Sequence, residues 1–126
     1  MQHTFFFDGN SKGIAWVLKT KNETFHEKRE HAEIYLDKIT KLQSKYIALH
    51  VGLFWGIGRF IIKNEDQISI KIDDKKMFDH LSENDEPFDG FIKTRSNFIS
   101  KFIKQRKLKV NFEMIDSKNN LSSKLI

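Results

Sequence analysis

The sequence predicts an α/β fold in which a mixed five-stranded sheet is flanked by helices. Three observations carry this prediction. Two short aromatic-rich segments near the N-terminus are joined by a turn that contains glycine, which is typical of a hairpin. A longer apolar segment, residues 42–60, has the length of a buried helix. Residues 68–73 then alternate strictly between apolar and polar side chains, so a helix is expected to cross over between strands of one sheet.

The composition indicates one domain spanning residues 1–126. A chain of 126 residues has room for one hydrophobic core, and 39% hydrophobic residues with 12 Phe exclude a disordered chain. The absence of cysteine excludes disulfides and thiolate zinc sites and favours a reducing, cytoplasmic location. The 22 Lys and Arg outnumber the 17 acids, and the net charge of +5 favours a polyanionic partner.

The N-terminal third is expected to form three strands. Thr4–Phe7 and Gly13–Lys19 are rich in aromatic and branched residues, and the turn at 8–13 joins them. Residues 24–39 fit either a helix or a strand. Because apolar and polar residues alternate in this stretch, we expect a third strand around Glu33–Asp37.

The middle of the chain is expected to form a helix, a strand and a second helix. Leu42–Phe60 is predicted to be a helix buried on most of its circumference, with glycines that allow a neighbouring element to approach closely. Residues 46–62 also contain a histidine and an arginine, so we expect no membrane span here. Ile68–Asp73 is predicted to be a strand and Lys75–Leu81 a short helix.

The C-terminal part begins with an acidic loop, Ser82–Gly90, that contains the single proline. From Phe91 onward, Phe and Ile recur at helical spacing and predict an amphipathic helix. Its opposite side is basic and carries Lys93, Lys101, Lys104 and Lys107. Val110–Met114 is the expected last strand, and Leu121–Ile126 a short helix or a frayed tail.

Four parts of the sequence, taken in order, resemble the type-one ribonuclease H family. Residues 5–13, FFFDGNSKG, are similar to the family's first strand, which ends on a catalytic aspartate. Residues 44–53, SKYIALHVGL, are similar to its first helix, and residues 68–77, ISIKIDDKKM, to its fourth strand and the turn that follows. Residues 112–125 resemble its last strand and terminal helix. The resemblance covers nearly the whole chain and implies a ribonuclease H-like fold.

The resemblance also implies where a catalytic site would lie. In this family four carboxylates hold two magnesium ions, which clamp the attacking water and the leaving oxygen of an RNA phosphate. Asp8 and Asp73 match two of these catalytic and metal-binding positions, whereas Lys45 and Ser123 stand at the other two. An ammonium in place of a carboxylate changes the local charge by two units and opposes a cation. We therefore expect binding of Mg or Mn to be weak or absent.

Other residues offer alternatives at this site. Asp116, just past the last strand, and Glu33, on the expected third strand, are candidate substitute carboxylates, of which Asp116 is the better placed. Asp8 also fits an ordinary turn residue, and Asp74 fits a cap for the helix that follows.

The basic helix indicates how nucleic acid would be bound. Residues 91–112 contain seven Lys or Arg and no acid, so this stretch alone exceeds the net charge of the chain. The four lysines named above are therefore candidate phosphate contacts, which position a backbone without reading its sequence. The alternative is an ordinary solvated helix face.

These observations favour a ribonuclease H-like, nucleic-acid-binding domain in which nuclease activity is lost or impaired. The expected ligand is an RNA–DNA hybrid or double-stranded RNA, recognised by backbone shape and charge. One alternative is an active magnesium-dependent ribonuclease H with a substituted carboxylate. Another is a protein-interaction module that retains only the fold.

Overall fold

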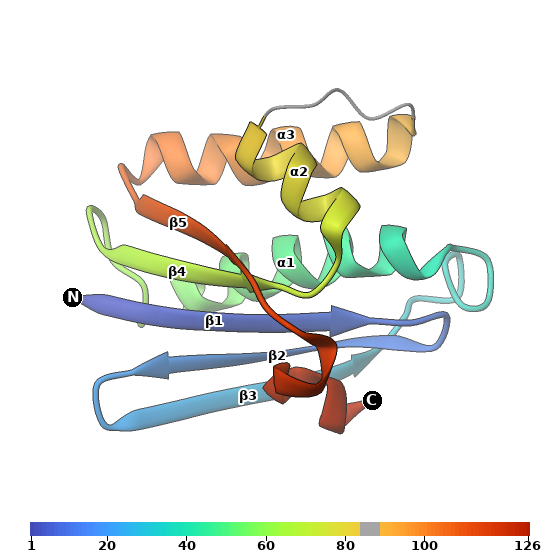
Figure 1. Cartoon of the computed structure of the whole chain (residues 1–126), viewed down its shortest axis with the longest axis horizontal. Helices are drawn as coiled ribbons and strands as arrows, with labels where there is room; N and C mark the ends of the chain where they lie inside the picture. Colours follow the sequence, from blue (N-terminus) through green and yellow to red (C-terminus); the bar gives the residue numbers. More distant parts are fainter. Residues whose placement is uncertain (84–88) are drawn as a thin grey trace.

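The computed structural model describes residues 1–83 and 89–126. Within these ranges the elements follow the predicted order of strands and helices (Figure 1). They are β1 (Gln2–Gly9), β2 (Gly13–Thr20), β3 (Glu23–Glu30), α1 (Lys41–Gly58), β4 (Gln67–Ile72), α2 (Lys75–Glu83), α3 (Gly90–Gln105), β5 (Lys109–Met114) and the 3-10 helices η1 (Ser117–Asn119) and η2 (Leu121–Leu125). Most of the predicted acidic loop lies outside the described residues.

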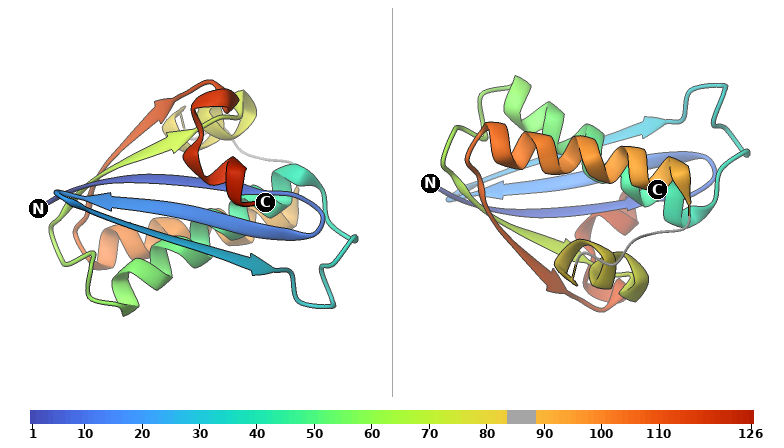
Figure 2. Two further views of the ribbon diagram at one scale, coloured as in Figure 1. Left: turned by 90° about the horizontal axis from the view of Figure 1, so that it is seen from below. Right: turned by 90° about the horizontal axis from the view of Figure 1, so that it is seen from above.

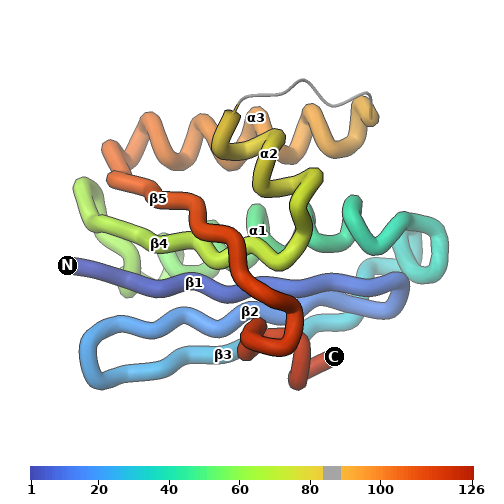
Figure 3. The backbone as a smooth tube through the Cα atoms, viewed as in Figure 1, coloured from blue at the N-terminus to red at the C-terminus, as the bar shows by residue number. Residues whose placement is uncertain are grey.

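The strands form one mixed five-stranded sheet, as the sequence predicts, and their order is β3-β2-β1-β4-β5. β1, β2 and β3 form an antiparallel meander, whereas β4 runs parallel to β1 and β5 parallel to β4. The carboxyl ends of β1, β4 and β5 therefore lie at the same edge of the sheet (Figure 3).

The third strand is β3, and its predicted position at Glu33–Asp37 is wrong. Residues 33–37 form turns in which the N–H groups of Tyr35 and Leu36 donate to the carbonyl of Ala32, and Ile34 is 69% exposed. β3 is an edge strand that pairs only with β2, and its side chains are mostly exposed. A largely polar sequence can therefore form this strand. A two-residue turn, in which Lys21 has a φ of 49°, sets its register against β2.

Helix α1 crosses the sheet and builds the core. It begins with a capping box, in which the Thr40 hydroxyl accepts from the Gln43 N–H and the Gln43 side chain accepts from the Thr40 N–H. A Cβ atom on Gly52 would lie 2.5 Å from the ring of Phe5, so the glycine allows the close approach to β1 that the sequence predicts. The buried side chains of α1 share one core with Phe5, Trp16 and the inward residues of β4.

The sheet is covered differently on its two faces (Figure 2). α1 packs on one face, and α3 packs beside α1. η2 lies on the opposite face, against β1 and β2. α2 packs against β4 and β5, the two strands at one side of the sheet. No helix in residues 1–83 and 89–126 is both long enough and apolar enough to cross a membrane.

Candidate functional site

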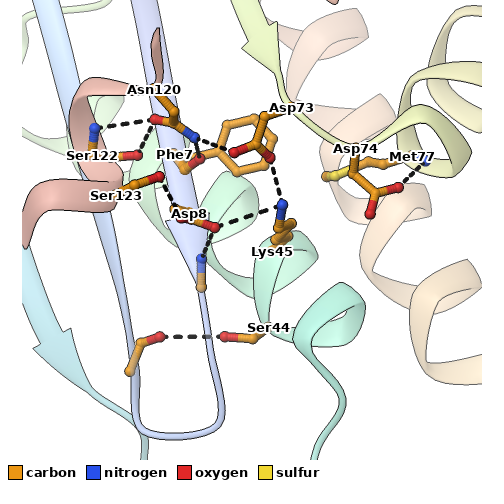
Figure 4. A network of polar contacts seen from close by, with 12 residues as sticks. Phe7, Asp8, Ser44, Lys45, Asp73, Asp74, Met77, Asn120, Ser122 and Ser123 are labelled. Carbon is orange, nitrogen blue, oxygen red and sulfur yellow. Dashed lines mark hydrogen bonds and ion pairs between the residues drawn. The ribbon is translucent and has the colours of Figure 1, made fainter. Parts of the chain in front are cut away.

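The candidate site lies at the carboxyl ends of β1 and β4, where the parallel register brings two aspartates together (Figure 4). Asp8 is near the end of β1, and Asp73 directly follows β4. Helix α1 reaches this edge with its N-terminal turns. Gly9 permits this contact, because a Cβ atom there would lie 2.3 Å from the Ser44 hydroxyl. Two neighbouring strands and one helix thus position the acidic side chains.

Lys45 of α1 lies between the two aspartates. Its Nζ donates to Asp73 Oδ1 at 2.5 Å and lies 3.7 Å from Asp8 Oδ1. Lys45 is only 5% exposed, and both carboxylates are similarly buried. A buried charge is costly unless it is paired, so this ammonium compensates charges that would otherwise repel each other.

The C-terminal segment supplies the remaining hydrogen bonds of the cluster. Ser123 Oγ donates to Asp8 Oδ2 at 2.6 Å, and Asn120 Nδ2 donates to Asp73 Oδ2 at 2.9 Å. The Gly9 N–H donates to Asp8 Oδ1 at 2.8 Å. All four carboxylate oxygens therefore have a donor from the chain itself, which holds both side chains in one arrangement.

Asn120 is a site residue that sequence reasoning missed. Its Nδ2 also donates to the Phe7 carbonyl at 2.9 Å, while its Oδ1 accepts from both the N–H and the hydroxyl of Ser122. Asn120 caps η2 and is almost fully buried. An asparagine before a short Ser-rich helix is a capping signal, but the sequence does not indicate that the same amide reaches Asp73.

The donor set does not fit two magnesium ions. Mg²⁺ favours carboxylates, with oxygen ligands in octahedral geometry, whereas here an ammonium lies between the carboxylates of Asp8 and Asp73. Among the described residues, no group of three or more His, Cys, Asp or Glu side chains is arranged to hold a metal ion. Two carboxylates and one ammonium carry a net charge of −1, against −4 for four carboxylates.

The two candidate substitute carboxylates have other positions. Asp116 is exposed and caps η1, where its Oδ1 accepts from the Lys118 N–H at 3.1 Å. Glu33 is exposed in the turns between β3 and α1. Asp74 accepts from the Met77 N–H at 3.0 Å and caps α2, which confirms the capping interpretation.

A surface hollow of about 590 Å³ opens over the aspartates. Its lining includes the exposed residues Lys41 and Lys118 and also Asp74, so three lysines and three aspartates surround the hollow. Next to the cluster, burial and the charge of Asp74 raise the pKa of Tyr46 well above its usual value. The Tyr46 hydroxyl therefore stays neutral, and it lies 2.5 Å from His80 Nδ1.

The predicted basic residues of α3 spread along the helix and do not converge on this hollow. The N-termini of α1 and α3 lie together, since Gln43 Nε2 donates to Asp89 Oδ2 at 2.7 Å, so Lys93 lies toward the site edge. Lys107 lies outside α3, which ends at Gln105, so its predicted place on the helix is wrong. It lies at the far end of the molecule, because Lys109 pairs with Gln67 at the start of β4. Lys101 and Lys104 are exposed on the C-terminal half of α3.

Comparisons with known proteins give a clear result for structure and none for sequence. No protein-family model and no curated protein matches the sequence. Among solved structures, the chain is similar to ribonuclease H1 from the halophilic archaeon Halobacterium salinarum NRC-1, with a TM-score of 0.73, 14% identity, and coverage of 98% of this chain and 96% of that one. It is also similar to the N-terminal ribonuclease H domain of Rv2228c from Mycobacterium tuberculosis, with a TM-score of 0.78, 14% identity and 98% coverage of both chains.

A third similar structure is LC11-RNase H1 in complex with an RNA/DNA hybrid, with a TM-score of 0.72 and 15% identity, covering 98% of this chain and 91% of that one. At such identities the likeness shows the fold.

Proposed function

Since the chain has the ribonuclease H fold, we propose that it is a nucleic-acid-binding domain whose nuclease activity is lost or impaired. The observation that carries the proposal is the position of Lys45, whose ammonium lies between Asp8 and Asp73. The ammonium belongs to the chain and holds the place between the carboxylates that a cation would otherwise occupy.

Electrostatics supports the loss of metal binding. A divalent cation near the aspartates would meet a fixed positive charge a few ångströms away, in a buried setting where charges interact more strongly than in water. It would also have to displace the hydrogen bonds that Ser123 and Asn120 make to the carboxylates. Asp116 and Glu33 offer no compensation, because each is exposed and lies outside the hollow.

The proposed ligand is an RNA–DNA hybrid or double-stranded RNA, bound through its phosphates. A similar structure was solved with an RNA/DNA hybrid, which supports this class of ligand. The net charge of +5 and the acid-free basic stretch at residues 91–112 support a polyanion. Lys93, Lys101, Lys104 and Lys107 would extend the contact along α3. A cytoplasmic location remains a prediction of the cysteine-free composition.

Cleavage of a labelled RNA–DNA hybrid tests the catalytic part of the proposal. With magnesium or manganese we expect no detectable product, because Lys45 stands where a metal-binding carboxylate is needed. Binding of the uncleaved hybrid is measured in parallel by fluorescence anisotropy, so that loss of catalysis is separated from loss of binding. Robust turnover that Asp8→Asn abolishes would contradict the proposal and establish an active metal-dependent nuclease.

A further inference from the structure

Two phenylalanine rings lie exposed near the C-terminal end of α1. Phe60 is 81% exposed and Phe54 61%. Single exposed apolar residues are common, but a group of aromatic rings on one surface marks an interaction site more often than a random feature.

The rings border a groove of about 660 Å³ between the C-terminal halves of the two helices and the segment after α1. Its apolar lining includes Phe54, Ile57, Phe60, Ile62 and Phe102. The ring centroids of Phe54 and Phe102 are 5.7 Å apart, so this wall of the groove is already packed. The groove has the size and the apolar lining of a site that binds the side chains of a ligand.

Phe60 has a position that folding alone does not explain. It directly follows the helix cap Arg59 and has a φ of 62°, the left-handed conformation that glycine adopts most easily at the end of a helix. Its N–H donates to the Ile57 carbonyl at 3.0 Å, an interaction that any residue but proline would make. The phenyl ring is largely outside the core, so neither the turn nor the core requires it.

The surroundings of the groove are basic. Lys63 and Arg106 line it. Neither α1 nor α3 contains an acidic residue. Glu65, whose N–H donates to the Arg106 carbonyl, lies at this end of the molecule but does not line the groove. The charge therefore favours an acidic occupant.

We propose that this groove docks an amphipathic helical segment of another protein, with apolar side chains at helical spacing and acidic residues beside them. Helix-in-groove recognition uses apolar anchors of this kind, and the basic rim would pair with the flanking acids. The floor made by Ile57 and Ile62 is aliphatic and suits aliphatic or aromatic side chains better than nucleobases. The groove lies at the far end of α1 from Asp8 and Asp73, so it is a separate site (Figure 1).

Peptide display tests the proposal. The library contains random peptides of about four helical turns. Peptides that bind the Phe60→Gly variant are first removed, and the remaining peptides are then selected for binding to the full wild-type chain. Glycine adopts the positive φ without strain, so Phe60→Gly keeps the fold, which thermal denaturation verifies. The most enriched peptide is labelled, and its affinity is measured by fluorescence anisotropy for the wild type and three variants.

We expect enriched peptides with apolar residues at helical spacing and an excess of Asp and Glu. Affinity should fall about tenfold or more in Phe60→Gly and in Lys63→Glu/Arg106→Glu. It should not change in Lys28→Glu/Lys38→Glu, a matched reversal of two exposed lysines outside the groove.

Four results would overturn the proposal. One is no enrichment on the wild type over Phe60→Gly, and another is enrichment of neutral or basic peptides. The third is self-association in sedimentation experiments that Phe60→Gly abolishes, which would make a second copy of the chain the occupant. The fourth is binding of a single-stranded oligonucleotide that Phe60→Gly abolishes, which would assign the rings to nucleic acid.

Discussion

At the scale of single residues, Lys45 determines what the aspartate cluster can bind. The side chain comes from α1, whereas its two partners come from β1 and from the end of β4, so the cluster ties the helix to the sheet. Ser123 completes the cluster from the far end of the sequence. Two of the four positions are therefore acidic, one is cationic and one is neutral.

Restoring the two missing carboxylates should create a metal site. We expect Lys45→Glu/Ser123→Asp to bind magnesium measurably by calorimetry, because four anions would then converge. The free energy of unfolding of this variant should rise with added magnesium, whereas that of the wild type should not change. Lys28→Glu, an exposed charge reversal outside the hollow, serves as the control. Absence of any gain would show that these positions do not converge as the structure places them.

His50 provides a test of pH dependence at the same scale. Burial, with a further contribution from the neighbouring Arg95 guanidinium, lowers the pKa of His50. Arg95 Nη1 donates to His50 Nδ1 at 2.9 Å, and this bond requires that nitrogen to be unprotonated. The unfolded chain therefore takes up a proton more readily, so this contribution to stability is present above the unfolded pKa of about 6.5 and is lost as pH falls below it.

We expect urea denaturation to show a larger loss of stability between about pH 7.5 and 5.5 for the wild type than for His50→Gln. The difference should stay below about 1.4 kcal/mol per pH unit, the limit for one proton, because the ring is only half-buried. Other titrating groups are common to both proteins and cancel in the comparison. Parallel pH profiles would show that His50 is not held neutral in the folded chain.

At the scale of elements, α3 is the helix whose pattern was easiest to interpret from the sequence. Ile92 and Ile99 are buried as the helical spacing predicts, while Lys101 and Lys104 are exposed. The aromatic side chains of α3 also contact α1, since Phe98 and Phe102 both lie against the ring of His50. The sequence indicates an apolar side but not that part of it borders a surface groove.

The lysines of α3 should make binding of nucleic acid depend on salt. For a labelled RNA–DNA hybrid, we expect the slope of log affinity against log salt to flatten by roughly one unit per lost contact in Lys101→Glu/Lys104→Glu. Sequence preference should not change, since phosphates carry no sequence information. Anisotropy titrations across a salt series measure both. The matched pair Lys28→Glu/Lys38→Glu should keep the wild-type slope, and equal slopes for all three proteins would remove α3 from the binding surface.

At the scale of the whole molecule, local sequence patterns predicted most of the fold. The alternation of apolar and polar side chains in strands, and their spacing in helices, involve residues that are close together in the chain. Such patterns can be recognised in the sequence, so the expected bounds of β1, β2, β4, β5 and the three helices are near those observed. β3 was misplaced because an edge strand has little apolar pattern, whereas residues 32–36 alternate by chance in a turn. A domain limited to residues 1–126 remains a prediction.

The site was predictable only in part, for a related reason. The parallel register brings Asp8 and Asp73 together, but two of the bonds that hold them come from Asn120 and Ser123, more than forty residues away in sequence. Their match to catalytic positions remains a prediction. His31 is also buried, and its Nε2 lies 2.7 Å from the Ser44 hydroxyl. Such long-range hydrogen bonds leave no periodic signal in the sequence.

Helix α1 carries Lys45 in its second turn and Phe54 near its C-terminal end. At 1.5 Å per residue these positions are about 14 Å apart along the axis. A duplex that starts at the aspartates and also contacts Lys101 and Lys104 would reach the groove, which Phe102 and Arg106 line at the same end of α3. Bound peptide would then lower the apparent affinity for the duplex, and bound duplex would lower that for the peptide by the same factor.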